Sequence, residues 1–475
     1  MQEYFAGFDV GRTFHVLVVV DESGKTVLKR RVENTFEAVT EAAERVQSGT
    51  SEGEVYWAVE MVDRNARMLV ETLVRMGKKV YQSTPYRLKR FKEAAAQPRK
   101  SDPIDAAALA NLLRLRRHEL TAINIPSKEV LMLRNLSRSA NRLSDERTRQ
   151  INHLEDVITS YCPDLIVKWP GYSFACKTML RLLKEYPDIA SMAALGDAVL
   201  LSKVKRFSNG KFGQEHVAVI KRAAETLVRR GVCTEPHAGD ILDAIDLIEL
   251  IDAKLAAKER LLEQALCECE VAERLMKLSG ISVRIAGTII GEVGDIKRFA
   301  SEAKLATYCG LAPLCRQSGK SKGTNRLARQ TNKRLLRVMY LSALSSIKCY
   351  GLSKAYYQRK LAGTDAGHVD KIRAIIALAR HRCRIIFKIL SREGYVYEPK
   401  QTEQPFVEGR RDGQHTMRVP ARGAVKTGQR KKDMTGEAIQ RPAAVEVRDA
   451  AEDLEIALLL QQGTTTPLPE HAMTE

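Results

Sequence analysis

The sequence predicts an α/β domain followed by a mainly helical remainder, and three observations support this fold class. Short apolar runs separated by turns fill residues 1–120, as strands packed with helices would. Apolar residues recur at steps of three and four in residues 121–270, and helical periodicity returns in residues 271–395. Residues 396–475 are rich in Gln, Gly, Arg and Lys with little periodicity, which predicts a basic, disordered tail.

The composition indicates a polyanionic partner. The 475 residues include 77 Lys and Arg against 58 Asp and Glu, a formal net charge of +19. Such an excess is typical of proteins that bind nucleic acid. The sequence has no run of 18 apolar residues and no signal-peptide pattern at its N-terminus, so we expect no membrane partner and a cytoplasmic location. Its nine Cys show no zinc-site spacing.

The first 120 residues predict a mixed sheet. Three strands are expected at 5–11, 14–21 and 26–32, followed by a helix at 36–46, a strand at 55–61, a helix at 64–76 and a strand at 78–83. A three-strand meander followed by alternating helices and strands is the order expected of a ribonuclease-H-like or RuvC-like domain.

Four carboxylates fall where such a sheet would hold metal ions. Asp9 lies within the first strand, Glu60 interrupts the apolar fourth strand, and Asp102 and Asp105 share the start of a helix that Pro103 favours. An acid in a buried strand is costly unless it is paired or metal-bound. The four acids therefore predict a catalytic site with two Mg²⁺ ions about 4 Å apart.

A structural interpretation of the same acids stays open. Asp9 could pair with Arg12, Glu60 could pair with Arg64, and Asp102 could serve only as a helix cap.

Residues 121–270 predict a helical arm. The stretches 133–158 and 241–266 have coiled-coil spacing, and a less regular, partly basic region at 162–235 separates them. An antiparallel arm or a dimerisation device is the expected use, and a helical bundle without an oligomeric role is the alternative.

A cationic loop in residues 271–395 predicts a nucleophile for phosphodiester chemistry. Ser318 is followed by Gly319, so the backbone can approach a phosphate and the hydroxyl is unobstructed. A helix is expected from 327 to 341. No Asp or Glu occurs between residues 316 and 337, where eight cations are expected to bind nucleic acid: Arg316, Lys320, Lys322, Arg326, Arg329, Lys333, Arg334 and Arg337. The alternatives are a loop that only contacts phosphate, and Ser321 as the nucleophile.

A second nucleic-acid contact is expected at residues 275–286, which resemble the turn of a helix-hairpin-helix. Gly280 allows the tight turn, and free amides at the start of the next helix can hold a phosphate. Ser282 replaces the glycine that is usual in that turn.

Together these motifs resemble the DEDD-type insertion-sequence transposases (the IS one-ten family), which include the pilin-gene invertases. The resemblance covers roughly residues 4–395. The matching positions are Asp9, Glu60, Asp102-x-x-Asp105-Ala106, Leu278-x-Gly280-Ile281, Gly310-Leu311-x-Pro313, Ser318-Gly319 and Asn332-Lys333-Arg334-Leu335. Ala328 stands where the family often has Ser or Thr, and Thr331 where it usually has Gly, so the turn after Arg329 departs from the family pattern.

The resemblance implies a bacterial, nucleoid-associated recombinase that acts on the DNA of element ends and target. It implies a RuvC-like domain whose four acids bind Mg²⁺, and a C-terminal transposase domain that supplies Ser318. It further implies a noncoding bridge RNA as guide, and a dimer or tetramer with a composite site across protomers. A covalent phosphoserine and a Holliday-junction-like intermediate complete that expectation. Two other functions remain open: a RuvC-like, metal-dependent junction nuclease, and a non-catalytic nucleic-acid-binding scaffold.

Overall fold

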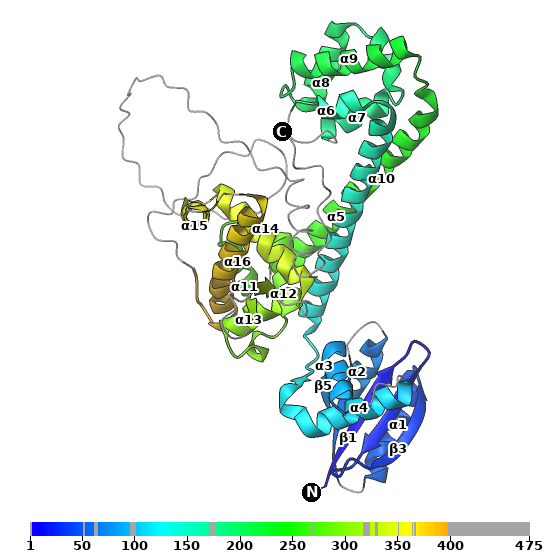
Figure 1. Ribbon diagram of the computed structural model, residues 1–475, viewed down its shortest axis with the longest axis vertical. Coiled ribbons are helices and arrows are strands. Elements are labelled where there is room, and N and C mark those ends of the chain that lie inside the picture. Colours follow the sequence, from blue (N-terminus) through cyan, green and yellow to red (C-terminus); the bar gives the residue numbers. More distant parts are fainter. Residues whose placement is uncertain are drawn as a thin grey trace, which may run out of the picture. The chain divides into compact units, whose positions relative to one another are not determined.

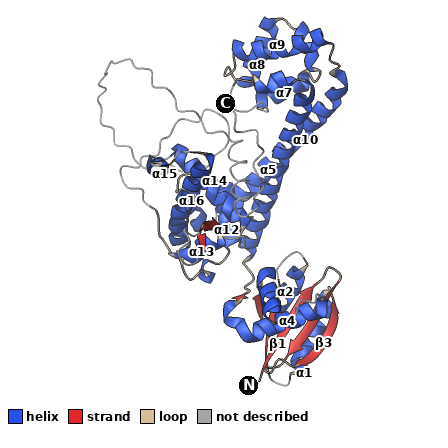
Figure 2. Ribbon diagram, viewed as in Figure 1, coloured by secondary structure: helices blue, strands red, loops and turns tan. Residues whose placement is uncertain are grey.

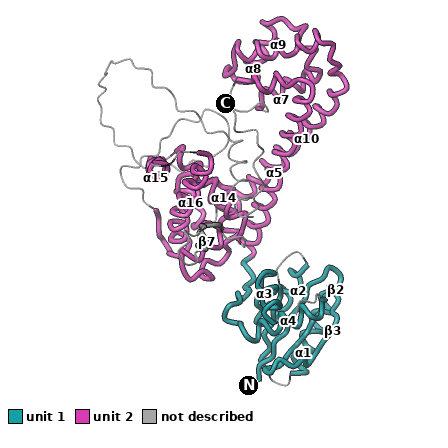
Figure 3. The backbone as a smooth tube through the Cα atoms, viewed as in Figure 1, with its two compact units in different colours: residues 1–127 teal, residues 128–475 magenta. Residues whose placement is uncertain are grey.

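The computed structural model divides the chain into two compact units, residues 1–127 and 128–475 (Figures 1 and 3). It describes residues 2–50, 53–60, 65–95, 101–170, 176–267, 269–316, 324–327, 331–349, 351–362, 364 and 367–397. The disorder predicted for the tail concerns residues that, from 398 onward, lie outside this range. Within the described residues, no helix is both long and apolar enough to cross a membrane.

The first unit contains a six-stranded mixed sheet with the order β3-β2-β1-β4-β5-β6 (Figure 2). The strands are β1 (Glu3–Val10), β2 (Phe14–Val20), β3 (Thr26–Glu33), β4 (Glu54–Val59), β5 (Lys79–Gln82) and β6 (Thr121–Ala122). Strand β4 is parallel to β1 and β5, whereas the β1–β2, β2–β3 and β5–β6 pairs are antiparallel. The predicted meander followed by alternating helices and strands is confirmed.

Helices cover both faces of this sheet. They are α1 (Phe36–Gly49), α2 (Ala66–Arg75), α3 (Pro85–Ala94) and α4 (Asp102–Arg116), with a 3₁₀ turn at Arg117–Glu119. Because side chains alternate along a strand, Phe8 and Trp57 face the core under α1 and α2. Phe5 and Tyr56 face the opposite core, under α3 and α4. Apolar burial on both faces thus holds the sheet between two helical layers.

The second unit contains two long antiparallel helices, α5 (Lys128–Tyr161) and α10 (Ala238–Cys267), which lie side by side (Figure 1). Leu133 and Leu266 belong to the core at one end of the pair, and Ile158 and Ile241 belong to the core at the other. Midway along the pair, Arg147 of α5 forms an ion pair with Asp252 of α10. The predicted arm is therefore built of long helices, and its role in oligomerisation stays a prediction.

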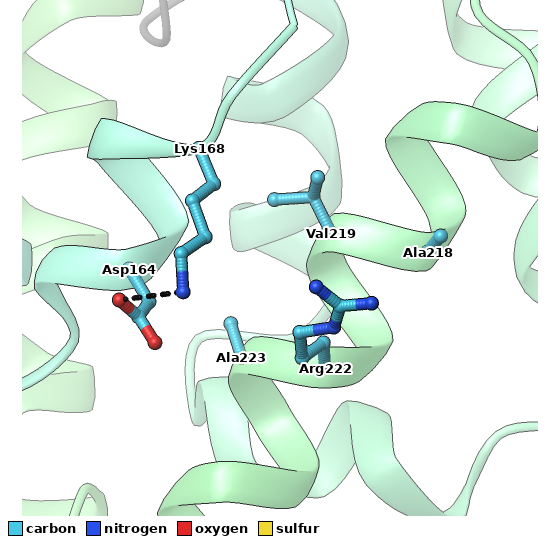
Figure 4. Close-up of a pocket in the computed structure, with 6 residues that line it drawn as sticks. All are labelled: Asp164, Lys168, Ala218, Val219, Arg222 and Ala223. Atoms are coloured by element: carbon cyan, nitrogen blue, oxygen red, sulfur yellow. Dashed lines mark ion pairs between the residues drawn. The ribbon is translucent and has the colours of Figure 1, made fainter.

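Residues 162–237, which connect α5 to α10, form a group of short helices at one end of the arm, called the helical head below. The sequence of this region is less regular than that of the arm. Its elements are α6 (Pro163–Val167), α7 (Lys177–Glu185), α8 (Asp197–Ser208) and α9 (Gln214–Arg230), with 3₁₀ turns at Ile189–Ala194 and Glu235–His237. The head has a cavity of about 250 Å³, which Figure 4 shows together with an ion pair between Lys168 Nζ and Asp164 at 3.1 Å. No predicted site residue lines this cavity, and we assign it no chemistry.

The other end of the arm joins the C-terminal module. Its elements are α11 (Glu270–Met276), α12 (Val283–Val293), a 3₁₀ turn at Ile296–Arg298, α13 (Glu302–Tyr308), β7 (Pro313–Arg316), β8 (Thr324–Leu327), α14 (Lys333–Cys349), α15 (Gly351–Leu361) and α16 (His368–Ser391). Ile289, Met339 and Ile386 join α12, α14 and α16 in one apolar core with α5 and α10. The helix predicted from Leu327 begins only at Lys333, because Leu327 pairs with Pro313 in the β7–β8 hairpin.

Candidate active site

A contact between Gly7 and helix α4 brings the start of that helix to the sheet. A Cβ atom added at Gly7 would lie 2.3 Å from the carbonyl oxygen of Ala106 and 2.6 Å from the amide nitrogen of Ala110. No side chain fits there, so the backbone of α4 rests directly on β1. Because α4 begins at Asp102, its first turn lies near the carboxyl end of β1.

The strand register places Asp9 and Glu60 at the same edge of the sheet. Strand β1 pairs in parallel with β4, and Phe8 lies opposite Val59. Asp9 is the next residue of β1, whereas β4 ends at Val59, so Glu60 follows this strand instead of interrupting it. Asp9 also shares the sheet face of Gly7, which α4 covers. Ligands of open α/β sheets bind at this edge.

The electrostatics show that all four predicted acids gather there. Burial raises the pKa of the half-buried Asp9, and the negative charges of Asp102, Asp105 and Glu60 raise it further, to about 6. The hydrogen bond from the backbone of Val10 opposes this shift. Asp102, Asp105 and Glu60 therefore each lie within electrostatic range of Asp9, and a shared catalytic role for the four acids stays a prediction.

These acids do not enclose a common ion-binding position. Within the described residues, no three His, Cys, Asp or Glu side chains lie close enough to hold a metal ion together. Charges act over a longer distance than the roughly 2.0–2.6 Å of a metal–oxygen bond, so the two observations are compatible.

Lys92 of α3 is a member of the site that sequence reasoning missed. Its ammonium forms an ion pair with Asp105, and the two side chains are only 13% and 17% exposed. No feature of the sequence distinguishes Lys92 from the other basic residues of α3. A cation thus already neutralises one of the four acids.

Two of the three structural roles open to the acids are not seen, and the pairing of Glu60 with Arg64 is not tested. Among the described residues, Asp9 forms no ion pair with Arg12, and Arg64 lies outside that range. Ser101, rather than Asp102, occupies the N-cap position of α4.

The cationic segment is described only in part. Ser318, Gly319, Lys320, Ser321 and Lys322 lie outside the described residues, as does Arg329. Arg316 and Arg326 belong to the antiparallel strands β7 and β8, which residues 317–323 connect in the sequence.

At the start of α14 the predicted cations have different environments. Lys333 and Arg334 are exposed, whereas Arg337 is half-buried and forms an ion pair with Asp145 of α5. The side chain of Asn332 caps the helix, because its Oδ1 accepts hydrogen bonds from the amides of Arg334 at 3.1 Å and Leu335 at 3.2 Å. Lys333 and Arg334 therefore stand at a helix N-terminus, a position that favours anions.

Gly280 lies in a turn that packs against α14. Its φ is +80°, and an added Cβ would lie 2.5 Å from the carbonyl oxygen of Ser342. Arg382 of α16, which is 3% exposed, donates hydrogen bonds to the carbonyl oxygen of Ser279 and to Oγ of Ser342. Burial lowers the pKa of Arg382 to about 10. A buried guanidinium thus supports the turn, and no sequence pattern predicted this contact.

Comparison with known protein families shows to which family this chain belongs. A transposase family model named for the DEDD acids matches residues 6–163, and a second, described as the transposase IS116/IS110/IS902 family, matches residues 272–358. Together they span just over half of the chain. The chain belongs to the IS116/IS110/IS902 family of transposases.

Curated relatives agree with this assignment. The transposase is 27% identical over 393 residues to an uncharacterized 44.8 kDa protein of insertion element IS116 from Streptomyces clavuligerus, with 81% of this chain and 94% of the relative covered. It is 26% identical over 403 residues to an uncharacterized 42 kDa protein of IS900 from Mycobacterium paratuberculosis, with 84% of this chain and 98% of the relative covered. It is 24% identical over 369 residues to a mini-circle putative transposase for IS117 from Streptomyces coelicolor, covering 75% and 87%.

The assignment confirms that the protein is a DNA-processing enzyme of an insertion sequence. It implies DNA binding and, for a DEDD family, a divalent metal in general. The acidic edge fits such an ion. Carboxylate oxygens are hard ligands, and Lys92 forms an ion pair with only one of the four carboxylates.

Proposed function

We propose that this transposase cuts and rejoins DNA with Ser318 as nucleophile and with Mg²⁺ held by Asp9, Glu60, Asp102 and Asp105. The observation that carries the proposal is the position of Asp9, whose pKa is raised to about 6 by burial and, in addition, by the negative charges of Asp102, Asp105 and Glu60. So much negative charge at the carboxyl ends of two parallel strands is costly unless a cation binds there.

The covalent step exchanges one phosphodiester for another. The Oγ atom of Ser318 loses its proton and forms a bond to phosphorus, while the bond from phosphorus to one deoxyribose oxygen breaks and that oxygen takes up a proton. Attack on the phosphoserine by a deoxyribose hydroxyl of another strand reverses this sequence and releases the serine. When bound, Mg²⁺ stabilises the charge that develops on the phosphate oxygens.

The cationic segment supplies DNA contacts. No acid interrupts the eight Lys and Arg of residues 316–337, so their charge can neutralise several adjacent phosphates. The exposed Lys333 and Arg334 at the N-terminus of α14 add the positive end of a helix dipole to this charge. These groups position the backbone and carry no base specificity.

The position of the catalytic groups in the chain supports a composite site. The four acids belong to the first compact unit and Ser318 belongs to the second. We propose that the acids of one protomer act with the serine of another in a dimer or tetramer. A bridge RNA from the element itself is the proposed guide.

Strand exchange by point variants tests the chemistry. The purified transposase is incubated with DNA of element ends and target, with its co-purified RNA and Mg²⁺. Ser318→Ala is expected to abolish the covalent protein–DNA product, and Ser321→Ala is the matched control that retains it. Asp9→Asn and Asp102→Asn are expected to abolish cleavage while DNA binding persists.

Three outcomes would favour other functions. Full strand exchange by Ser318→Ala would refute the serine nucleophile. Cleavage without any covalent product would favour a junction nuclease that uses metal-activated water. DNA binding without cleavage under every divalent metal would favour a scaffold. Sequencing the co-purified RNA tests the guide, because a transcript from the flanks of the gene is expected and bulk cellular RNA would contradict it.

A further inference from the structure

A buried carboxylate links the arm to the C-terminal module. Glu292 of α12 is 3% exposed and accepts two hydrogen bonds from Arg138 of α5, from Nε at 2.5 Å and from Nη2 at 2.9 Å. Burial acts to raise the pKa of Glu292, but the hydrogen bonds from Arg138 and Asn332 outweigh it, so the pKa lies below its usual value. Glu292 is therefore a charged group with both oxygens engaged.

The third partner of Glu292 stands where the chain returns from the β7–β8 hairpin. Asn332 donates a hydrogen bond from Nδ2 to Oε2 of Glu292 at 2.9 Å, while its Oδ1 caps α14. Its backbone amide donates to the carbonyl oxygen of Tyr308 at 2.8 Å. Tyr308 is the last residue of α13, just before the hairpin begins. One residue thus ties together both ends of the segment that contains β7 and β8.

The arm contributes a continuous polar face to this contact. Arg134, Arg138, Asn141 and Asp145 follow one another at steps of four, three and four, so they share one side of α5. Arg134 donates to the carbonyl oxygen of Gly291 at 2.6 Å, and Asn141 contacts Thr288. A Cβ added at Gly291 would lie 2.7 Å from the Cα atom of Arg134, so α12 touches the backbone of α5. Asp145 holds Arg337 of α14.

The polar composition of the contact between α5 and α12 indicates that it positions these elements more than it stabilises them. The carboxylate of Glu292 must leave water to form this pair, whereas the side chain of Arg138 remains 36% exposed. Such a pair is often no more stabilising than apolar residues of the same size. Its hydrogen bonds instead require one geometry, since a small displacement would leave a buried charge without its partner. The cluster therefore fixes the placement of Asn332 relative to α5 more strictly than apolar packing would.

We propose that Glu292 is a positioning residue, which through Asn332 fixes the β7–β8 hairpin against the arm helix α5. This inference rests on the proposed function, in which Ser318 lies between these two strands. The arm then sets the placement of the strands from which the nucleophile acts, although neither Glu292 nor Arg138 contacts DNA in this role.

Variants of Asn332 separate positioning from helix capping. Asn332→Asp keeps a residue type that caps helices well, but it places a second negative charge against Glu292. We expect a rate of covalent-adduct formation at least tenfold lower, with an unchanged Kd for DNA. Glu292→Gln combined with Asn332→Asp restores an amide–carboxylate hydrogen bond in the reverse sense and is expected to recover part of the rate. A wild-type rate for Asn332→Asp alone would reduce the role of Asn332 to capping and refute the proposal.

A matched pair of arginines on α5 provides the control. Arg138 and Arg147 each hold a carboxylate through Nε and Nη2, but Arg147 binds Asp252 in the arm. Arg138→Gln is expected to slow adduct formation and to speed hydrogen exchange of the β7 and β8 amides. Arg147→Gln is expected to change neither. Equal effects of the two variants would overturn the positional role.

Hydrogen exchange keeps this test independent of the serine chemistry. If the wild-type protein cut DNA without forming a covalent adduct, the proposed function would fail, but protection of β7 and β8 would still report on Glu292. If the adduct formed and Arg138→Gln left both the rate and the protection unchanged, only the positional role would be wrong.

Discussion

Substitution of Gly7 tests whether contact between β1 and α4 builds the acidic site. In Gly7→Ala the new Cβ would lie 2.3 Å from the carbonyl oxygen of Ala106, whereas ordinary contacts begin at 3.4 Å. The obstacle is backbone, so α4 must move by about 1 Å, which as overpacking costs about 1–3 kcal/mol of folding free energy. The same displacement moves Asp102 and Asp105 away from Asp9, and a 1 Å misplacement lowers rates by about 100-fold.

Two measurements separate stability from activity. The chain has two tryptophans, Trp57, which is buried in the first unit, and Trp169. In a Trp169→Phe background, the fluorescence of Trp57 therefore reports urea unfolding of the first unit. Strand exchange gives the activity. Gly49→Ala is the matched control, because no atom lies within 4 Å of its added Cβ, and we expect it to keep stability and rate. If Gly7→Ala unfolded at the wild-type urea concentration and kept full activity, α4 could not rest on β1 as described.

Three further predictions concern charge. Because the pKa of Asp9 is raised to about 6, this group stabilises the metal-free fold most below pH 3.8, and its contribution is lost as the pH rises to about 6. In Asp9→Asn the melting temperature should therefore fall less over this pH range than in the wild type. An unchanged pH profile of the melting temperature would contradict this prediction. Lys92→Met should lower the Kd for Mn²⁺ measured by calorimetry about tenfold, because it removes a competing cation from Asp105. The control Arg87→Met should leave this Kd unchanged. Weaker Mn²⁺ binding by Lys92→Met would contradict the prediction and show that Lys92 orients Asp105. Arg334→Ala should weaken DNA binding and lower by about one the slope of log K for DNA binding against log salt concentration. Arg337→Ala breaks the ion pair with Asp145 and should mainly lower the melting temperature. Equal slopes for the two variants would contradict this prediction.

The four candidate acids could be selected from the sequence because their signals are local. Asp9 and Glu60 each disturb an apolar strand, and Asp102 and Asp105 stand at a recognisable helix start. The period of two in the strands then fixes which side chains share a face. Gathering the acids at one edge needed only the parallel pairing of β1 with β4, which the predicted order of elements favours.

The remaining residues depend on contacts between distant segments. Lys92, Glu292 and Arg382 are each one polar residue among many on a helix, and only tertiary packing shows which of them is buried against a partner. Leu327 was assigned to a helix because apolar and basic residues continue beyond it. Its pairing with Pro313 in β8 overrides that local preference, and Asn332 sets the true helix start.

The ion pair between Lys92 and Asp105 bears on the order in which the enzyme matures. In small zinc domains the chain stays unfolded until metal arrives, since nothing else balances the ligand charges. Here an internal ammonium offsets one charge, so repulsion among the acids is limited from the outset. A newly made chain can therefore finish folding first and bind its ion afterwards, when the cation displaces a side chain instead of organising the domain.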